Sequence, residues 1–152
     1  MSVAVFVLAL GFGLIAADVS AQSKASATGK NKEKQAQIME WKESFGGLPE
    51  GGHHVIRDSE TWKNYWTRIR QDALPVVDFE KKMVLASFLG TKNTGGWGVE
   101  IVRVERKKKK ALVRFKEIKP SGDAFVIQAV TSPYHIKVVD RFNEPVEFKA
   151  LP

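Results

Sequence analysis

The chain has 152 residues, a formal net charge of +7 and no cysteine. This length predicts one domain with a substantial hydrophobic core, to which nine phenylalanines and four tryptophans contribute. The lack of cysteine excludes disulfide bonds, thiolate metal sites and a cysteine nucleophile. The positive charge suits an acidic partner surface or an anionic polymer, and does not choose between them.

The first 21 residues have the pattern of a secretory signal peptide. An apolar run over residues 3–17 precedes a small-x-small site, Val19-Ser20-Ala21, which predicts cleavage before Gln22. The alternative is a single membrane anchor, but the run is short for a span of about 20 residues. We therefore expect residues 1–21 to be a signal peptide, the protein to be periplasmic or extracellular, and no stable membrane span to remain after cleavage.

Residues 22–45 are expected to contain a linker and a first helix. Residues 22–31 contain no apolar side chain larger than alanine, which predicts a disordered linker, so residues 32–152 are the expected single domain. A helix is expected over residues 31–45 because Ile38, Trp41 and Phe45 fall on one stripe. The alternative places Trp41 on an edge strand.

The clearest helical pattern lies at residues 60–71. Its apolar side chains recur at i, i+3, i+4 and i+7, namely Trp62, Tyr65, Trp66 and Ile69. Asp58 or Ser59 supplies the N-cap. We expect the aromatic side chains of this helix to pack on a sheet.

The centre of the chain predicts two strands joined by a glycine loop. Residues 83–89 form an apolar run that is typical of a buried strand, and residues 97–104 alternate like a half-buried strand. The sequence Gly90-Thr91-Lys92-Asn93-Thr94-Gly95-Gly96 between them favours an antiparallel hairpin. A shift of apolar phase at Ile101 and Val102 predicts a bulge, or a strand covered on both faces.

Further short strands are expected at residues 53–57, 111–116, 125–130, 134–138 and 146–148. The lysines of residues 107–110 and the Pro-Ser-Gly-Asp of residues 120–123 predict turns. The expected fold is α+β: one amphipathic aromatic helix packed on an antiparallel, meander-like sheet of six or seven strands. A half-closed β-barrel plugged by the helix is the alternative.

Four segments resemble the C-terminal domain of the PrcB-like protease-complex subunit family. They are residues 55–62 with Trp66, residues 77–84, residues 90–101, and Gln128 with residues 131–136. This family takes its name from a subunit that associates with and stabilises a secreted protease. The resemblance therefore implies an exported, non-catalytic domain with a protease as a suspected partner.

Two segments are candidate binding sites. The first comprises Lys92, Asn93, Thr94, Gly95, Gly96 and Trp97. Amides of a glycine-rich turn can form an anion-binding nest or contact a partner, although the segment lacks the P-loop pattern. The second comprises Thr131, Ser132, Pro133 and Tyr134, which could line a groove or offer an edge for a partner strand. The alternatives are a structural turn and a proline bend.

No catalytic, metal or cofactor site is expected. The adjacent His53 and His54 point to opposite faces of a strand. The spacing of Ser132 and His135 in a strand does not place the imidazole as a base beside the hydroxyl, as a serine hydrolase requires. Nucleic acid is not an expected partner, because the aromatics serve the core. We expect a binding module for a secreted or envelope protein; the alternative is an envelope module that binds a small anionic ligand or polyanion through the glycine loop and the basic turn.

Overall fold

A computed structural model describes residues 39–152 of the chain. The expected signal peptide at residues 1–21 and linker at residues 22–31 lie outside the described residues. The described part forms seven strands and one helix: β1 (Glu40–Glu43), β2 (Gly51–Ile56), α1 (Ser59–Ile69), β3 (Lys82–Leu89), β4 (Gly98–Arg106), β5 (Ala111–Ile118), β6 (Tyr134–Asp140) and β7 (Val146–Ala150).

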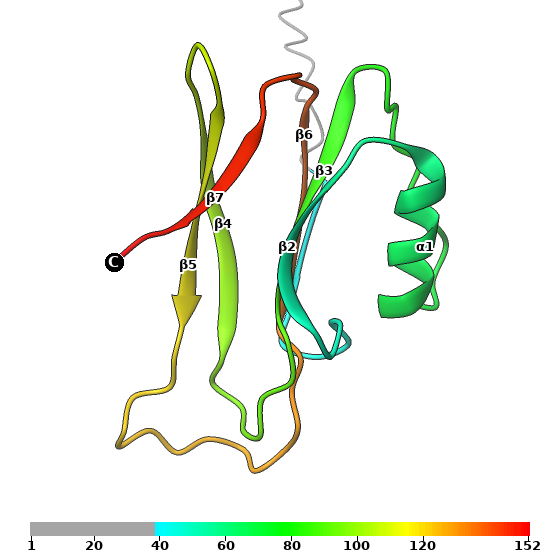
Figure 1. Cartoon of the computed structure of the whole chain (residues 1–152). Coiled ribbons are helices and arrows are strands. Elements are labelled where there is room, and N and C mark those ends of the chain that lie inside the picture. Colours follow the sequence, from blue (N-terminus) through cyan, green and yellow to red (C-terminus); the bar gives the residue numbers. More distant parts are fainter. Residues whose placement is uncertain (1–38) are drawn as a thin grey trace, which may run out of the picture. The chain divides into compact units, whose positions relative to one another are not determined.

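The strands form two sheets instead of one (Figure 1). The first has the order β1-β6-β3-β2, and all its pairs are antiparallel. The second has the order β4-β5-β7, in which β5 and β7 are parallel. Helix α1 covers the outer face of the first sheet, and the second sheet covers its inner face. The α+β class and the strand number are confirmed; the meander order is wrong, and the described strands close no barrel.

Strand β3 lies at the centre of this arrangement because both of its faces are covered. Val84 and Phe88 face the helix, whereas Met83 and Leu85 face the second sheet, and all four side chains are buried. A strand that is covered on both sides reads as a nearly continuous apolar run, as the sequence does here.

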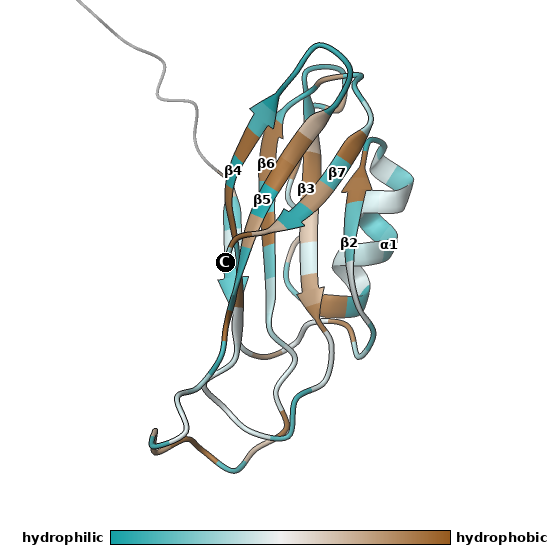
Figure 2. Cartoon of the chain, turned by 60° about the vertical axis from the view of Figure 1, so that its left-hand side comes forward, coloured by the Kyte–Doolittle hydropathy of each residue, from teal (hydrophilic) through white to brown (hydrophobic). Residues whose placement is uncertain are grey.

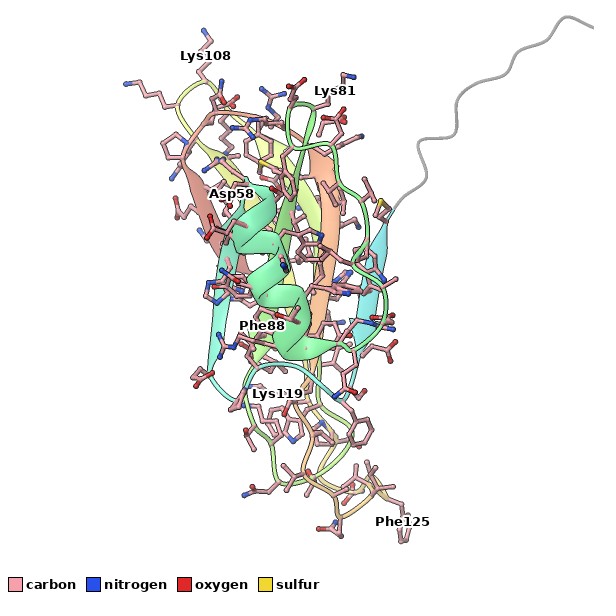
Figure 3. All side chains as sticks on the ribbon, turned by 90° about the vertical axis from the view of Figure 1, so that its right-hand side faces the viewer. Asp58, Lys81, Phe88, Lys108, Lys119 and Phe125 are labelled. Carbon is pink, nitrogen blue, oxygen red and sulfur yellow. The ribbon has the colours of Figure 1, made fainter. Side chains whose placement is uncertain are left out.

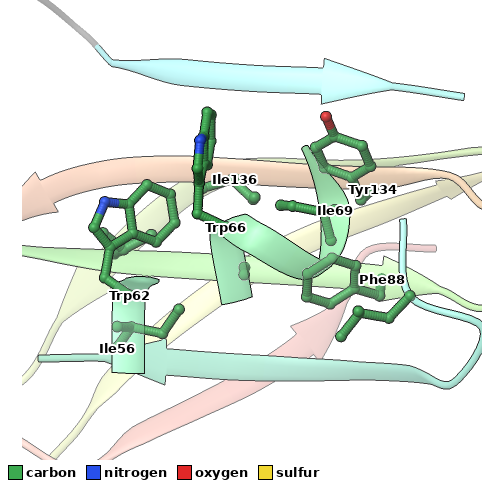
Figure 4. Packing of buried hydrophobic residues seen from close by; sticks show 10 residues of the cluster. Ile56, Trp62, Trp66, Ile69, Phe88, Tyr134 and Ile136 are labelled. Carbon is green, nitrogen blue, oxygen red and sulfur yellow. The ribbon is translucent and has the colours of Figure 1, made fainter. Parts of the chain in front are cut away.

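The helix holds its place through an aromatic layer (Figure 4). Asp58 begins the helix by accepting a hydrogen bond from the Thr61 amide at 2.7 Å, as expected of an N-cap. Trp62 and Trp66 are almost fully buried against the first sheet. Trp41 of β1 meets the Trp66 ring edge-on, with centroids 4.9 Å apart. Truncation of a buried tryptophan to alanine costs about 3–5 kcal/mol, so this layer is a major part of the fold's stability.

The expected central hairpin is wrong. Residues 82–89 and 98–106 are both strands, but they lie in different sheets, since β3 pairs with β2 and β6 while β4 pairs with β5. The glycine loop therefore carries the chain from one sheet to the other. Pairing on both edges leaves β3 no free edge for β4.

Two further expected elements differ from the structure. The helix over residues 31–45 is wrong where it can be compared, because residues 40–43 are strand β1 and Trp41 is the edge-strand residue of the alternative interpretation. Residues 31–38 lie outside the described part. The strand at residues 125–130 is also wrong, since this segment belongs to no sheet. The bulge is confirmed by a register shift between Ile101 and Arg103.

Candidate functional site

The two candidate segments lie together at one end of the domain. Lys92 and Thr131 exchange two backbone hydrogen bonds of 2.8 Å each, although they lie far apart in the sequence. The Thr131 hydroxyl also donates to the Thr94 carbonyl at 2.9 Å. The glycine loop and the Thr-Ser-Pro segment therefore form one structural unit.

This unit supports a third segment, residues 119–130, which we call the tip loop. The Gly95 amide donates to the Ile127 carbonyl at 2.9 Å. A side chain at Gly95 would place its Cβ only 2.6 Å from the Ile127 Cγ1, so the close approach requires glycine. Gly96 has a φ of +83°, and a Cβ there would lie 2.9 Å from Pro120 and Val126. These glycines therefore allow the tip loop to pack closely against the glycine loop. The Gly95 amide already donates to Ile127, so it is not available to bind an anion.

A small cleft lies beside Trp97. Its volume is about 350 Å³, and Lys42, Ser44 and Gly96 also line it. The Lys92 ammonium lies 5.0 Å from the centre of the Trp97 ring, within the range of a cation–π contact. Asn93 is exposed beside Lys92.

The charges of this cleft are paired. The Lys42 ammonium bonds Glu100 at 2.7 Å, and this hydrogen bond lowers the pKa of the Glu100 carboxyl. Glu43 also lines the cleft. The cleft therefore presents little free positive charge to a small anion.

The rest of the Thr-Ser-Pro segment anchors the backbone. The Ser132 carbonyl accepts from the Gly47 amide at 2.9 Å, and the Pro133 carbonyl accepts from the Leu89 amide at 3.0 Å. Tyr134 is buried in the helix-side core, and its hydroxyl accepts a hydrogen bond from Arg70 at 3.2 Å. Tyr134 thus serves the core and a separate hollow beside Arg70, not the cleft at Trp97.

The tip loop carries the most exposed large apolar side chains near this unit. Phe125 is fully exposed, and Ile127 and Val130 keep 59% and 65% of their surface in solvent. Figure 3 shows Phe125 projecting from the end of the domain opposite Lys108, and Figure 2 shows apolar positions along the same loop. Sequence reasoning missed these residues because their alternation is the pattern of a half-buried strand.

The histidines occupy three different environments. His53 bonds the Ser87 hydroxyl and stacks on Phe148, whereas His54 bonds the Tyr65 hydroxyl on the helix side. Adjacent histidines therefore point to opposite faces, as expected. Across the described residues, no three potential metal-ligating side chains lie close enough to hold a metal ion.

His135 joins the two sheets. Its Nδ1 accepts a hydrogen bond from the Ile101 amide of β4 at 2.6 Å, so its Nε2 carries the proton and donates to Glu40 of β1, also at 2.6 Å. The side chain has no exposed surface, and this burial lowers the pKa of His135, although Glu40 acts in the opposite direction. His135 is therefore a structural contact, and it makes no hydrogen bond to Ser132.

The fold and this end of the molecule define a class: a small helix-covered β-sandwich with an exposed apolar loop held by a glycine loop. The family model described as PrcB C-terminal matches residues 83–140, from β3 to the end of β6, and this match confirms the PrcB-like resemblance. The matched part contains the glycine loop, the tip loop and the Thr-Ser-Pro segment. Neither a curated protein nor a solved structure gave a match. The one described helix is too short and too polar to span a membrane.

Proposed function

We propose that this protein is an exported, non-catalytic binding module that docks on a secreted or envelope protein through the tip loop. The observation that carries the proposal is the full exposure of Phe125, together with the largely exposed Ile127 and Val130, on one short loop. The PrcB-like resemblance supports a protease as the partner, because the family's name comes from a subunit that associates with a protease.

The chemistry of the loop suits protein recognition. Aromatic side chains that enter a pocket of a partner supply much of the free energy of many interfaces. Burying Phe125 and Ile127 would contribute about 3–6 kcal/mol together, at about 1.5–3 kcal/mol for each side chain. This amounts to an affinity change of about 10²- to 10⁴-fold.

The backbone around the loop favours tight binding. The Gly95–Ile127 hydrogen bond and the Lys92–Thr131 pair hold its C-terminal half against the glycine loop. A loop that is already positioned loses less conformational entropy when it binds. The glycine loop therefore positions the docking residues and does not itself contact the partner in this proposal.

The test compares the tip loop with an exposed apolar position elsewhere on the protein. The tip variant carries Phe125→Ser and Ile127→Ser, and the matched control carries Val76→Ser, since Val76 is 91% exposed outside the tip loop. Circular dichroism and thermal unfolding should show that both variants keep the fold.

Each immobilised protein is then incubated with the extracellular and periplasmic fractions of its source cells. We expect the original protein and the Val76 control to retain the same partner, identified by mass spectrometry and assayed for peptidase activity. The tip variant should retain at least tenfold less. Equal retention by the tip variant, or no specific retention by the original protein, would refute the proposal.

A further inference from the structure

Residues 125–130 combine a strand-forming sequence with an unpaired backbone. The segment reads Phe-Val-Ile-Gln-Ala-Val, in which aromatic and β-branched residues predominate, and it carries no charge. Such a sequence normally forms a strand, yet the structure assigns it to no sheet. The conflict points to a strand whose partner is not part of this chain's described residues.

The hydrogen bonds of the segment are largely unused. Among the residues that the structure describes, residues 125–130 donate no backbone hydrogen bond to another backbone group. Only the Ile127 carbonyl accepts one, from Gly95. The Val126 carbonyl has only a long contact of 3.4 Å from the side-chain amide of Gln128.

The edge that faces away from the glycine loop carries free backbone groups. In extended backbone, the amide and carbonyl of successive residues point to opposite edges of the strand. The carbonyl of Ile127 faces the glycine loop. In an extended backbone over residues 126–128, ahead of the bend at Ala129, the carbonyls of Val126 and Gln128 would point away from the glycine loop, where a further strand can add.

We propose that residues 125–130 become an edge strand by pairing with an extended segment of the partner protein. This inference rests on the proposed function and states how the docking occurs: main-chain hydrogen bonds supply affinity, and the alternating side chains select the sequence. The Gln128 side chain would be displaced from the Val126 carbonyl by an amide of the incoming segment.

The charge of the protein determines which segment fits. Two copies of a chain with a net charge of +7 repel each other, which disfavours pairing between identical tip loops. Lys116 and Lys119 precede residues 125–130, and neither forms an ion pair with another described residue, whereas Asp123 is the one acidic residue of the tip loop. The expected occupant is an extended segment of a different protein, with alternating apolar residues and acidic flanks.

The first test uses the full-length protein and an octapeptide selected against it from a randomised displayed library. We expect alternating apolar positions with acidic flanks. In amide hydrogen exchange, the bound peptide should slow the exchange of Val126 and Gln128 at least tenfold. The same peptide with N-methyl groups on alternate amides should bind at least tenfold more weakly.

A matched pair of variants tests the backbone separately from the side chains. Gln128→Pro removes the outward amide, which donates no backbone hydrogen bond in the free protein, whereas Gln128→Ala keeps it. We expect the proline variant to lose peptide binding at least tenfold and the alanine variant to change less than threefold. Thermal unfolding of both variants verifies the fold.

Four results would overturn the inference. They are the failure to select any peptide, binding that leaves the exchange of residues 125–130 unchanged, equal binding by the two Gln128 variants, and protection that rises with protein concentration in the absence of peptide. The last result would assign the edge to a second copy. If the natural partner is lost with Phe125→Ser and Ile127→Ser but kept with Gln128→Pro, the proposed function holds and the strand pairing fails.

Discussion

The contact of His135 with the second sheet should make the protein less stable in mild acid. The imidazole is buried and neutral, since its Nδ1 accepts the Ile101 amide while its Nε2 donates to Glu40. Protonation would place a hydrogen on Nδ1 and break the bond to Ile101. Two lysines, Lys42 and Lys137, further disfavour the charged form.

The direction of the effect follows from proton binding. Burial lowers the pKa of His135 in the folded state, so the unfolded chain binds more protons below its ordinary pKa of about 6.5. Stability from His135 is therefore present in full above that pH and is lost as the pH falls below it. The loss approaches about 1.4 kcal/mol per pH unit until the folded pKa is reached.

Two variants of His135 separate its hydrogen bond from its titration. Asparagine keeps an acceptor for the Ile101 amide but cannot be protonated, whereas leucine leaves that buried amide without a partner, at a cost of about 1–3 kcal/mol. At pH 7.5 we expect His135→Leu to be less stable than His135→Asn by that amount. Between pH 6.5 and 5, both variants should lose less stability than the original protein.

The measurement is urea unfolding at several pH values between 7.5 and 5. This window separates the histidines from carboxyls such as Glu100, whose lowered pKa makes their contribution disappear only below about pH 4.5. His53 and His54 also have pKa values lowered by burial, so part of the slope should remain in both variants. An unchanged slope in His135→Asn would refute the assignment of His135 as a neutral inter-sheet contact.

Two further predictions concern the ends of the domain. Gly47→Ala should destabilise the protein by about 1–3 kcal/mol, because the added Cβ would clash with the Ser132 carbonyl oxygen. The control Gly122→Ala should change stability by less than about 0.5 kcal/mol, because no atom lies within 4 Å of its added Cβ. Equal melting temperatures of the two variants would contradict this prediction. Replacing the lysines of residues 107–109 by glutamine should leave stability within about 0.5 kcal/mol and should lower the salt concentration that elutes the protein from a heparin column. Elution at an unchanged salt concentration would exclude this turn as a contact for polyanions.

The sequence predicted the elements that depend on local pattern. The stripe of Trp62, Trp66 and Ile69 is the buried face of α1, and the acid at Asp58 caps it. The phase shift after Ile101 marks a real bulge. Each of these features depends on the spacing of side chains within one helix or strand, and this spacing can be read directly from the local sequence.

The sequence did not predict which strands pair. A glycine loop between two strand patterns suits a hairpin and a crossover between sheets equally well. Only the pairing of both edges of β3, with β2 and β6, decides between them. Trp41 shows the same limit, because its stripe with Phe45 is helical in spacing, yet pairing of β1 with β6 places it against Trp66. Tertiary packing overrides local pattern in both cases.

The candidate site shows why the same pattern can serve opposite roles. Gly95 and Gly96 suggested a ligand nest, but their lack of side chains is used to admit Ile127, Val126 and Pro120. The alternating residues of the tip loop suggested a core-facing strand, but the chain buries neither Phe125 nor Val130. Natural sequences are locally consistent with their folds except where function requires otherwise. Residues 125–130 are such an exception, because they have a strand-forming sequence, are held by the glycine loop, and pair with no strand of the described chain. In our proposal, a binding partner that pairs with this segment removes the conflict between its sequence and its structure.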